Sequence, residues 1–306
     1  KYKAKKIIIF SRDENKQFHM ENKFPDKNLR FFIGDVRDRE RLIMAMREVD
    51  YVIHAAAQKH VPLAEYNPIE CAKTNIDGAQ NVITAAIQCK VKKVIALSTD
   101  KATNPINLYG ATKLVAEKLF LSAHSLVGSQ DTKFGVVRYG NVINSRGSVI
   151  PFFKDLIKRK KAFIPITDPN MTRFFLTLEQ SVKFVVDSLS LISKSEVFIP
   201  KMYSLKIVDL LKSIDNKAKY KITGLRPGEK IDETLCASEE NKNILEFKNF
   251  YVIFQNSEYL EKFKLFYKKK FKNNSFKKVD KNFSYTSKNN KDFLNYNNIG
   301  KKFPKL

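Results

Sequence analysis

Short apolar runs alternate along the first 142 residues with segments whose apolar residues recur every three or four positions. The short runs predict buried strands, and the three-to-four spacing predicts helices. Strands are expected at 5–13, 29–35, 51–57, 92–100 and 134–142, and helices at 39–49, 68–90 and 108–126. Strands that are apolar throughout and alternate with helices form a parallel sheet covered on both faces. The pattern predicts a doubly wound α/β fold whose ligand lies at the carboxyl ends of the strands.

This regular alternation stops after residue 142, where short helices alternate with turns that contain Pro and Gly. We expect a Rossmann-type nucleotide-binding domain over 1–142, with 174–200 packing back on it. Residues 143–173 and 201–306 are expected to form a smaller α/β substrate-binding lobe and a basic C-terminal region.

The glycine pattern lacks one element of such folds. Dinucleotide-binding domains carry a Gly-rich turn after their first strand. The 10 glycines of this chain form no GxGxxG, GxxGxxG or P-loop sequence, and the chain enters a strand directly. We therefore expect a βα unit of about 30 residues to precede Lys1 in the natural protein. The 306 residues alone are expected to bind nucleotide poorly.

Composition narrows the class of protein. The apolar runs, such as 42–46, reach five residues, far fewer than a membrane helix needs, and no signal peptide is recognisable. The 3 cysteines form no CxxC pair and the 4 histidines no HxxxH pair, which favours a reducing compartment and no metal site. A cytoplasmic protein without membrane insertion is expected.

The net charge of +24 raises the question of nucleic acid. Residues 241–306 hold 16 lysines against 5 acidic residues, so +11 of the excess lies in this one segment. No RNA-recognition, zinc-finger or basic-zipper pattern accompanies it. We expect no nucleic-acid partner, whereas an anionic nucleotide would benefit from the same positive field.

One motif indicates acid–base chemistry. Tyr109 and Lys113 are four residues apart at the start of a predicted helix, which places phenol and ammonium on one face. The preceding strand ends in Ser98-Thr99-Asp100, so strand end and helix start meet at the ligand edge. An adjacent ammonium lowers a phenol's pKa and suits it to accept a proton.

The sequence resembles the extended short-chain dehydrogenases/reductases, and within them the inverting UDP-N-acetylglucosamine 4,6-dehydratases that begin pseudaminic acid synthesis. The similar segments span about three-quarters of the chain: 11–16, 31–38, 54–68, 73–83, 96–113, 136–153, 166–175 and 224–230. Two departures are the absent Gly-rich turn and a tail after about residue 255 that matches only loosely.

The resemblance implies NADP as cofactor. Arg12 stands where NAD-binding folds carry an acidic ribose ligand, and an arginine suits a 2′-phosphate. Arg12 as an ordinary surface cation, and Asp35 as part of a simple Gly-Asp turn, are the structural alternatives. The cofactor-binding residues implied are Ser11, Arg12, Asp13, Glu14, Asn15, Lys16, Asp35, Val36, Ala55, Ala56, Lys59, Tyr109 and Lys113.

The resemblance also implies how water is eliminated. Oxidation at C4 of the sugar acidifies the C5 proton, so a modest base suffices, and an acid must protonate the departing C6 oxygen. Lys101 is the implied C5 base and Asp100 the acid, with Thr99, Tyr109 and Lys113 completing the catalytic set. Asp100 should raise the pKa of Lys101, which opposes this role, whereas Lys113 and a cationic nicotinamide act in the other direction. A solvated charged turn is the structural alternative.

The substrate implied is a UDP-sugar, held by Lys59, Asn141, Arg173, Arg226 and Glu229. The expected activity is NADP-dependent dehydration of UDP-N-acetylglucosamine with inversion at C5, by a homo-oligomer, for flagellin glycosylation or surface polysaccharide. A retaining 4,6-dehydratase, a 4-epimerase and a non-catalytic fragment lacking the cofactor loop are the alternatives.

Overall fold

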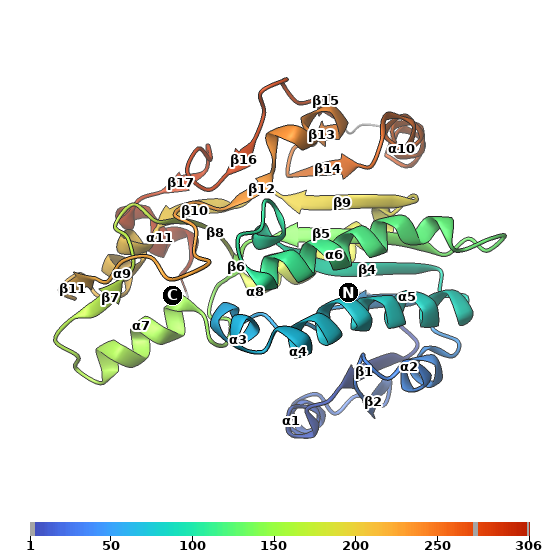
Figure 1. Cartoon of the computed structure of the whole chain (residues 1–306), viewed down its shortest axis with the longest axis horizontal. Coiled ribbons are helices and arrows are strands. Elements are labelled where there is room, and N and C mark those ends of the chain that lie inside the picture. Colours follow the sequence, from blue (N-terminus) through green and yellow to red (C-terminus); the bar gives the residue numbers. More distant parts are fainter. Residues whose placement is uncertain (1–3, 272–274, 305) are drawn as a thin grey trace.

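A seven-stranded sheet forms the centre of the computed structural model, which describes residues 4–271, 275–304 and 306 (Figure 1). Its strand order is β15-β13-β14-β9-β5-β4-β3. Strands β3, β4, β5 and β9 are parallel, and β14, β13 and β15 continue the sheet antiparallel. The strands are β3 (Tyr51–His54), β4 (Lys93–Thr99), β5 (Lys133–Tyr139), β9 (Ser195–Pro200), β13 (Ile244–Glu246), β14 (Phe250–Phe254) and β15 (Lys277–Lys278).

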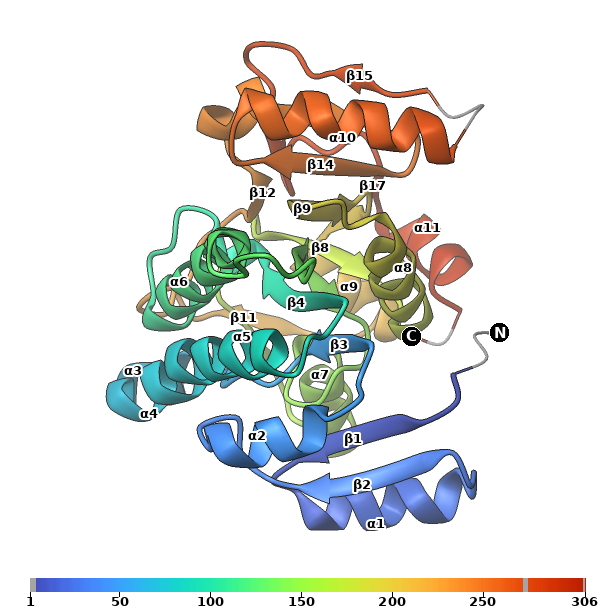
Figure 2. The same cartoon turned by 90° about the vertical axis from the view of Figure 1, so that its right-hand side faces the viewer.

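Helices cover both faces of this sheet (Figure 2). Along β4, Val94 and Ala96 belong to the core under α5 (Gly78–Gln88) and α6 (Leu108–Ser122). Ile95 belongs to the opposite core, under α8 (Leu178–Leu191) and α10 (Ser257–Lys270). Because both faces of the strand are buried, its sequence is apolar throughout. The predicted doubly wound α/β fold is confirmed.

The N-terminal unit stands beyond the β3 edge of the sheet (Figures 1 and 2). It consists of β1 (Ile7–Ser11), α1 (Glu14–Lys23), β2 (Leu29–Ile33) and α2 (Arg39–Met46). β1 and β2 pair in parallel as a separate two-stranded sheet, and among the described residues no ladder joins them to β3. Leu42 and Met46 of α2 attach the unit to the α5 core.

Three helical segments connect β3 to α5. They are α3 (Val61–Tyr66), α4 (Pro68–Ala72) and the π-helical η1 (Lys73–Asp77). Two of them, α4 and η1, run without a gap into α5, so 68–88 is helical as the sequence pattern predicts. Short 3₁₀ turns follow β4, α6 and β12 (Thr234–Cys236): η2 (Asp100–Ala102), η3 (Ala123–Ser125) and η4 (Ser238–Asn243).

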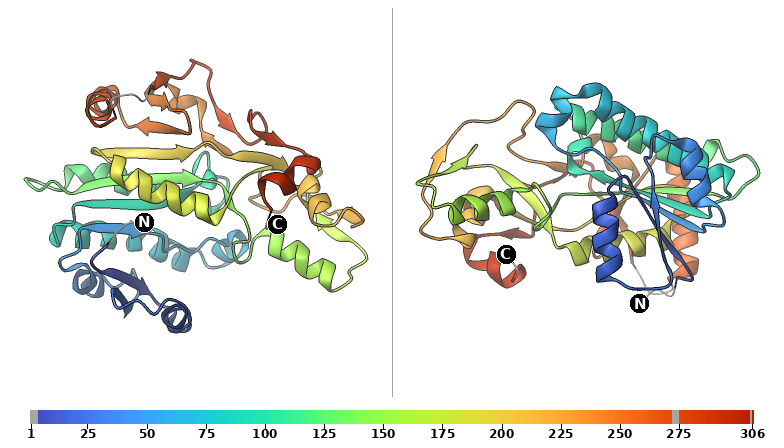
Figure 3. Two further views of the ribbon diagram at one scale, coloured as in Figure 1. Left: turned by 180° about the vertical axis from the view of Figure 1, so that it is seen from behind. Right: turned by 90° about the horizontal axis from the view of Figure 1, so that it is seen from below.

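The smaller lobe has its own core beside the carboxyl ends of β4 and β5 (Figures 1 and 3). Its sheets have the orders β17-β10-β8-β6, β11-β7 and β12-β16. The strands are β6 (Asn141–Val142), β7 (Ile164–Ile166), β8 (Thr172–Leu176), β10 (Tyr203–Lys206), β11 (Tyr220–Ile222), β16 (Tyr285–Thr286) and β17 (Phe293–Leu294). The helices are α7 (Val149–Lys158), α9 (Ile207–Ile214) and α11 (Tyr296–Lys302).

The expected domain boundary is wrong for part of 201–306. β13, β14 and β15 extend the large sheet, with β14 antiparallel to β9, and α10 packs Leu260 and Phe263 into the core under α8. The physical reason is the apolar run 250–254, which needs a buried partner strand. Within 174–200, β9 is a strand of the large sheet and α8 packs on that sheet, whereas β8 belongs to the smaller lobe.

Candidate active site

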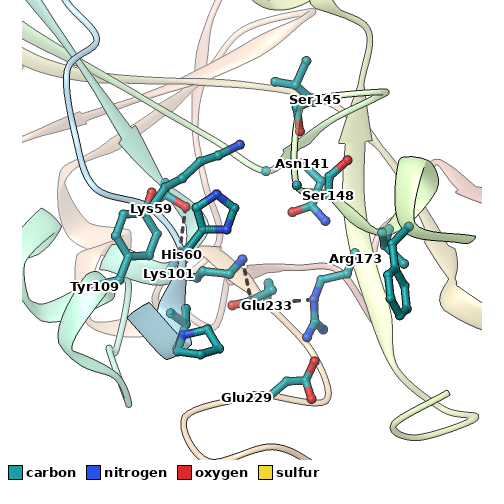
Figure 4. Close-up of a pocket in the computed structure, with 18 of the residues that line it drawn as sticks. Lys59, His60, Lys101, Tyr109, Asn141, Ser145, Ser148, Arg173, Glu229 and Glu233 are labelled. Carbon is teal, nitrogen blue, oxygen red and sulfur yellow. Dashed lines mark hydrogen bonds and ion pairs between the residues drawn. The ribbon is translucent and has the colours of Figure 1, made fainter. Parts of the chain in front are cut away.

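A cavity of about 900 Å³ opens between the carboxyl ends of β4 and β5 and the smaller lobe. Both lobes contribute polar side chains to it (Figure 4). The residues of the sequence prediction that line it are Ala55, Lys59, Thr99, Lys101, Tyr109, Lys113, Asn141, Arg173, Arg226 and Glu229. The structure thus brings together residues that lie as much as 174 positions apart in the sequence, at the predicted edge of the sheet.

Tyr109 enters the cavity from the first turn of α6. Asn107 caps this helix by accepting a hydrogen bond from the Gly110 amide at 2.8 Å. A side chain at position 110 would collide with the backbone carbonyl of Lys101, so the glycine allows the helix to begin against η2. Burial raises the pKa of Tyr109 to about 12, although the charge of Lys101 and a hydrogen bond with Thr99 oppose the rise.

Lys113 lies one turn further along α6, buried, with Nζ donating to the Leu97 carbonyl at 2.6 Å. Burial lowers its pKa to about 8, although the charge of Glu117 opposes the change. The sequence prediction made Lys113 the cation that lowers the Tyr109 pKa. In the structure Lys101 is the cation that lowers it most, because the Lys113 ammonium is held by the end of β4.

Lys101 lies between two carboxylates. Its Nζ is 3.0 Å from Asp100 Oδ1 and 3.1 Å from Glu233 Oε1. Burial alone would lower the pKa of Lys101, but the charges of Asp100 and Glu233 outweigh it and raise that pKa above its ordinary value. Thr99 orders the group by donating to Asp100 Oδ1 at 3.0 Å and accepting from the Lys101 amide at 3.4 Å.

Arg173 of β8 is buried, and its donors bind the protein itself. Nη1 donates to the carbonyls of Thr172 and Ile231, Nη2 donates to that of Lys230, and Nε lies 3.7 Å from Glu233 Oε1. The predicted role of gripping the UDP-sugar therefore competes with a structural one. In this arrangement Arg173 holds the segment that carries Glu233.

The other predicted substrate ligands lie around the opening. Lys59 Nζ donates to the Arg146 carbonyl at 3.0 Å and so bridges β3 to the loop before α7. Glu229 accepts a hydrogen bond from the Arg226 amide at 3.2 Å, which closes the turn of the RPGEK segment. Lys59, Arg226 and Asn141 all line the cavity.

The predicted adenine-end residues lie outside this cavity, at the carboxyl ends of β1 and β2. Arg12 Nη1 is 3.4 Å from Asp35 Oδ2, and Asp13 caps α1 by accepting from the Lys16 amide at 2.9 Å. Asp35 is also bound by Arg37 at 2.7 Å. Burial would raise the pKa of Asp35, but the arginines outweigh it and lower that pKa.

The remaining members of that set differ in exposure. Glu14 and Asn15 are exposed in the first turn of α1, Ser11 accepts from the Asp13 amide, and Ala56 is exposed after β3. Val36 is instead a core residue, buried against Gly78 of α5. Its predicted contact with adenine stays a prediction.

Sequence reasoning missed Glu233 and His60, which also line the cavity. His60 follows Lys59 directly, so its place in the same matched segment was the available signal. Glu233 lies in a loop without apolar periodicity, three residues after the RPGEK segment, where only its acidic character marks it. Across 4–271, 275–304 and 306, no group of three or more His, Cys, Asp or Glu side chains could hold a metal ion. Within the same residues, none of the helices could span a bilayer.

Comparison with known proteins finds a family model, relatives and a solved structure that each match most of this chain. A family model described as "Polysaccharide biosynthesis protein" matches residues 1–255. The chain is 53% identical over 293 residues to the UDP-N-acetylglucosamine 4,6-dehydratase (inverting) of Campylobacter jejuni subsp. jejuni serotype O:2, covering 94% of this chain and 86% of that protein. It is 44% identical over 253 residues to the UDP-glucose 4-epimerase of Rickettsia conorii, covering 81% of this chain and 74% of the relative. The X-ray structure of Pen from Bacillus thuringiensis is similar with a TM-score of 0.86 and 38% identity, over 99% of this chain and 90% of that one.

Proposed function

This chain belongs to the polysaccharide biosynthesis protein family, and we propose that it dehydrates UDP-N-acetylglucosamine across C5–C6 with inversion at C5. The observation that carries the proposal is that Tyr109, Lys113 and Lys101 line one cavity, while the buried Asp100 contacts Lys101 from behind it. Tyr109 with Lys113 suits oxidation and reduction at a sugar hydroxyl, and Lys101 with Asp100 suits elimination of water. The 53% identity to an inverting dehydratase supports this reaction.

NADP is the proposed cofactor. It supplies a hydride acceptor and donor, so the sugar is oxidised and reduced again without net redox change. Three features of the chain fit it. Lys113 and Tyr109 would hold the nicotinamide end, and the small side chain of Ala55 leaves room beside them. The Arg12 guanidinium, with a side chain 54% exposed, would hold a 2′-phosphate.

The chain's own groups move the protons. Tyr109 takes the proton of the C4 hydroxyl, which the Lys101 charge and the Thr99 hydroxyl favour by lowering the phenol's pKa against the effect of burial. Lys101 removes the C5 proton, and Asp100 protonates the departing C6 oxygen. Reprotonation of C5 from the opposite face gives the inverted product, a UDP-4-keto-6-deoxy-L-hexosamine, which we assign to the first step of pseudaminic acid synthesis.

The UDP group is proposed to lie against the outer wall of the cavity. Arg226 and Lys59 supply positive charge for the pyrophosphate there, and Asn141 and Glu229 supply hydrogen-bonding groups for the sugar.

The test is turnover of UDP-N-acetylglucosamine by the full-length natural protein in deuterated water, followed by magnetic resonance of the product. We expect a 4-keto-6-deoxy sugar that carries deuterium at C5 with inverted configuration, and no build-up of reduced cofactor. A C4 epimer that has lost no water would assign the chain to 4-epimerases, the activity named for the Rickettsia relative. Retention at C5, or stoichiometric reduced cofactor, would also contradict the proposal.

A further inference from the structure

The smaller lobe delivers a second carboxylate to Lys101. Glu233 Oε1 lies 3.1 Å from Lys101 Nζ, on a segment that is 132 residues away in sequence. Figure 4 shows Lys101 and Arg173 both reaching Glu233, with Arg173 Nε 3.7 Å from the same oxygen. Asp100 occupies another side of the ammonium at 3.0 Å.

Several segments fix Glu233 in this place. Its backbone amide donates to Ser287 Oγ at 2.9 Å, and its carbonyl accepts from the Ser287 amide at 2.8 Å. Ser287 Oγ in turn lies 2.6 Å from the Thr172 hydroxyl of β8. Lys230, three residues before Glu233, donates to the Thr103 carbonyl next to η2. The carboxylate is thus held by both lobes, and its position against Lys101 is built into the fold.

Each of the two carboxylates has one oxygen without a partner. Glu233 Oε2 and Asp100 Oδ2 are buried and have no hydrogen-bond donor within the described part of the protein. Buried carboxylate oxygens are rarely left without a donor, because removing them from water costs free energy that only a hydrogen bond or a proton restores. Two such oxygens beside one ammonium indicate places where a proton is taken up during the reaction.

We propose that Glu233 is a positioning residue that stores the proton of Lys101 during elimination. The Lys101 ammonium passes a proton to Glu233, breaking an N–H bond and forming an O–H bond. The resulting amine removes the C5 proton while the C5–C6 double bond forms and the C6–O bond breaks. Lys101 passes that proton to Asp100, and Asp100 passes it to the departing oxygen, which leaves as water. Glu233 then returns its proton to Lys101, so the three groups end with their starting charges.

The charges around Lys101 explain why such a store is needed. Because its two carboxylates hold Lys101 as an ammonium, it cannot act as a base until a neighbour accepts its proton. Glu233 Oε2 is available for this, because it is buried without a donor and belongs to the side chain that already contacts Nζ. The titratable or charged groups that surround Lys101 are Asp100, Tyr109, Arg173, Lys230 and Glu233.

This inference rests on the proposed function, and one experiment separates the two. The full-length natural protein and its variants are loaded with NADP+ and mixed with UDP-N-acetylglucosamine in deuterated water. The absorbance of reduced nicotinamide and the deuterium content at C5 are followed. In Glu233→Gln the amide still accepts from Lys101 but cannot store its proton. We expect dehydration to fall by about 10²–10⁴-fold while reduced nicotinamide accumulates, because oxidation at C4 still occurs. Glu233→Asp should recover part of the rate.

The matched control is Glu246→Gln on β13. This change removes a carboxylate that lies between Lys201 and Lys277, outside the cavity. It should keep the wild-type rate. Wild-type turnover in Glu233→Gln would overturn the inference alone. Loss of both dehydration and reduced nicotinamide in that variant would also overturn it, since Glu233 would then be merely structural. A wild-type protein that forms no dehydrated sugar would instead overturn the proposed function.

Discussion

Lys101 and Lys113 line the same cavity, yet their surroundings change their pKa values in opposite directions. Lys101 is held between two carboxylates, and its pKa is raised. Lys113 is buried against a backbone carbonyl, and its pKa falls to about 8. Two lysines twelve residues apart are therefore suited to the different tasks that we propose, one in the elimination of water and one beside the Tyr109 phenol.

We expect methionine substitutions to separate these tasks. Lys101→Met should slow deuterium exchange at C5 and dehydration by about 10²–10⁴-fold, while the affinity for the cofactor stays nearly unchanged. Lys113→Met should weaken cofactor binding and block the first hydride transfer. The measurements are deuterium exchange at C5, single-turnover reduction of the cofactor, and calorimetric cofactor binding. If the Lys101→Met variant exchanged the C5 proton for deuterium at the wild-type rate, Lys101 would not be the base, and Tyr109 would become the next candidate.

At the scale of elements, α6 is the support on which the site depends. It carries Tyr109 and Lys113 toward the cavity and, one turn later, places Glu117 against the buried guanidinium of Arg138 on β5. Arg138 also contacts Glu240 of η4 at 3.1 Å and the Leu235 carbonyl at 2.7 Å. One buried arginine therefore ties α6 to the large sheet and to the segment that follows β12.

Replacing Arg138 should destabilise the whole fold. Arg138→Met leaves Glu117 as a buried charge without its partner, which typically costs about 3–5 kcal/mol of the free energy of unfolding. Urea denaturation followed by circular dichroism measures this loss of unfolding free energy. The control is Arg159→Met on α7, whose exposed pair with Asp155 should contribute less than about 0.5 kcal/mol. Equal losses in the two variants would show that the buried network does not support α6.

The strands and helices up to residue 142 could be predicted because each carries its own periodic pattern. Val94, Ile95 and Ala96 supply two different cores, which is why the strand reads as continuously apolar. The strands β13 and β14 were not predicted as part of the large sheet. β14 pairs with β9, about 50 residues earlier, and β13 pairs with β14. No local pattern in a lysine-rich segment encodes these partners.

At the scale of the whole molecule, the candidate site forms where the two lobes meet. Thr99, Asp100, Lys101 and, eight residues later, Tyr109 were predictable as candidates because one strand end and one helix start carry them all. Glu233 was not, because its contact with Lys101 depends on how Ser287 and Arg173 hold the smaller lobe. Tertiary position, rather than residue type or spacing, places it in the site.

The surface of the α3–α4 connection predicts that the protein self-associates. Leu63 and Tyr66 of α3 and Ile69 of α4 are 61%, 85% and 66% exposed, and apolar side chains gathered on adjoining turns mark interaction surfaces more often than isolated ones do. We expect a homo-oligomer that the double change Tyr66→Asp with Ile69→Asp reduces to a smaller species in sedimentation equilibrium. Leu265→Asp on α10, where the native side chain is 64% exposed, should leave the mass unchanged. The physical reason for the prediction is burial of these apolar side chains between copies of the chain. A wild-type monomer, or a double variant of unchanged mass, would therefore contradict it.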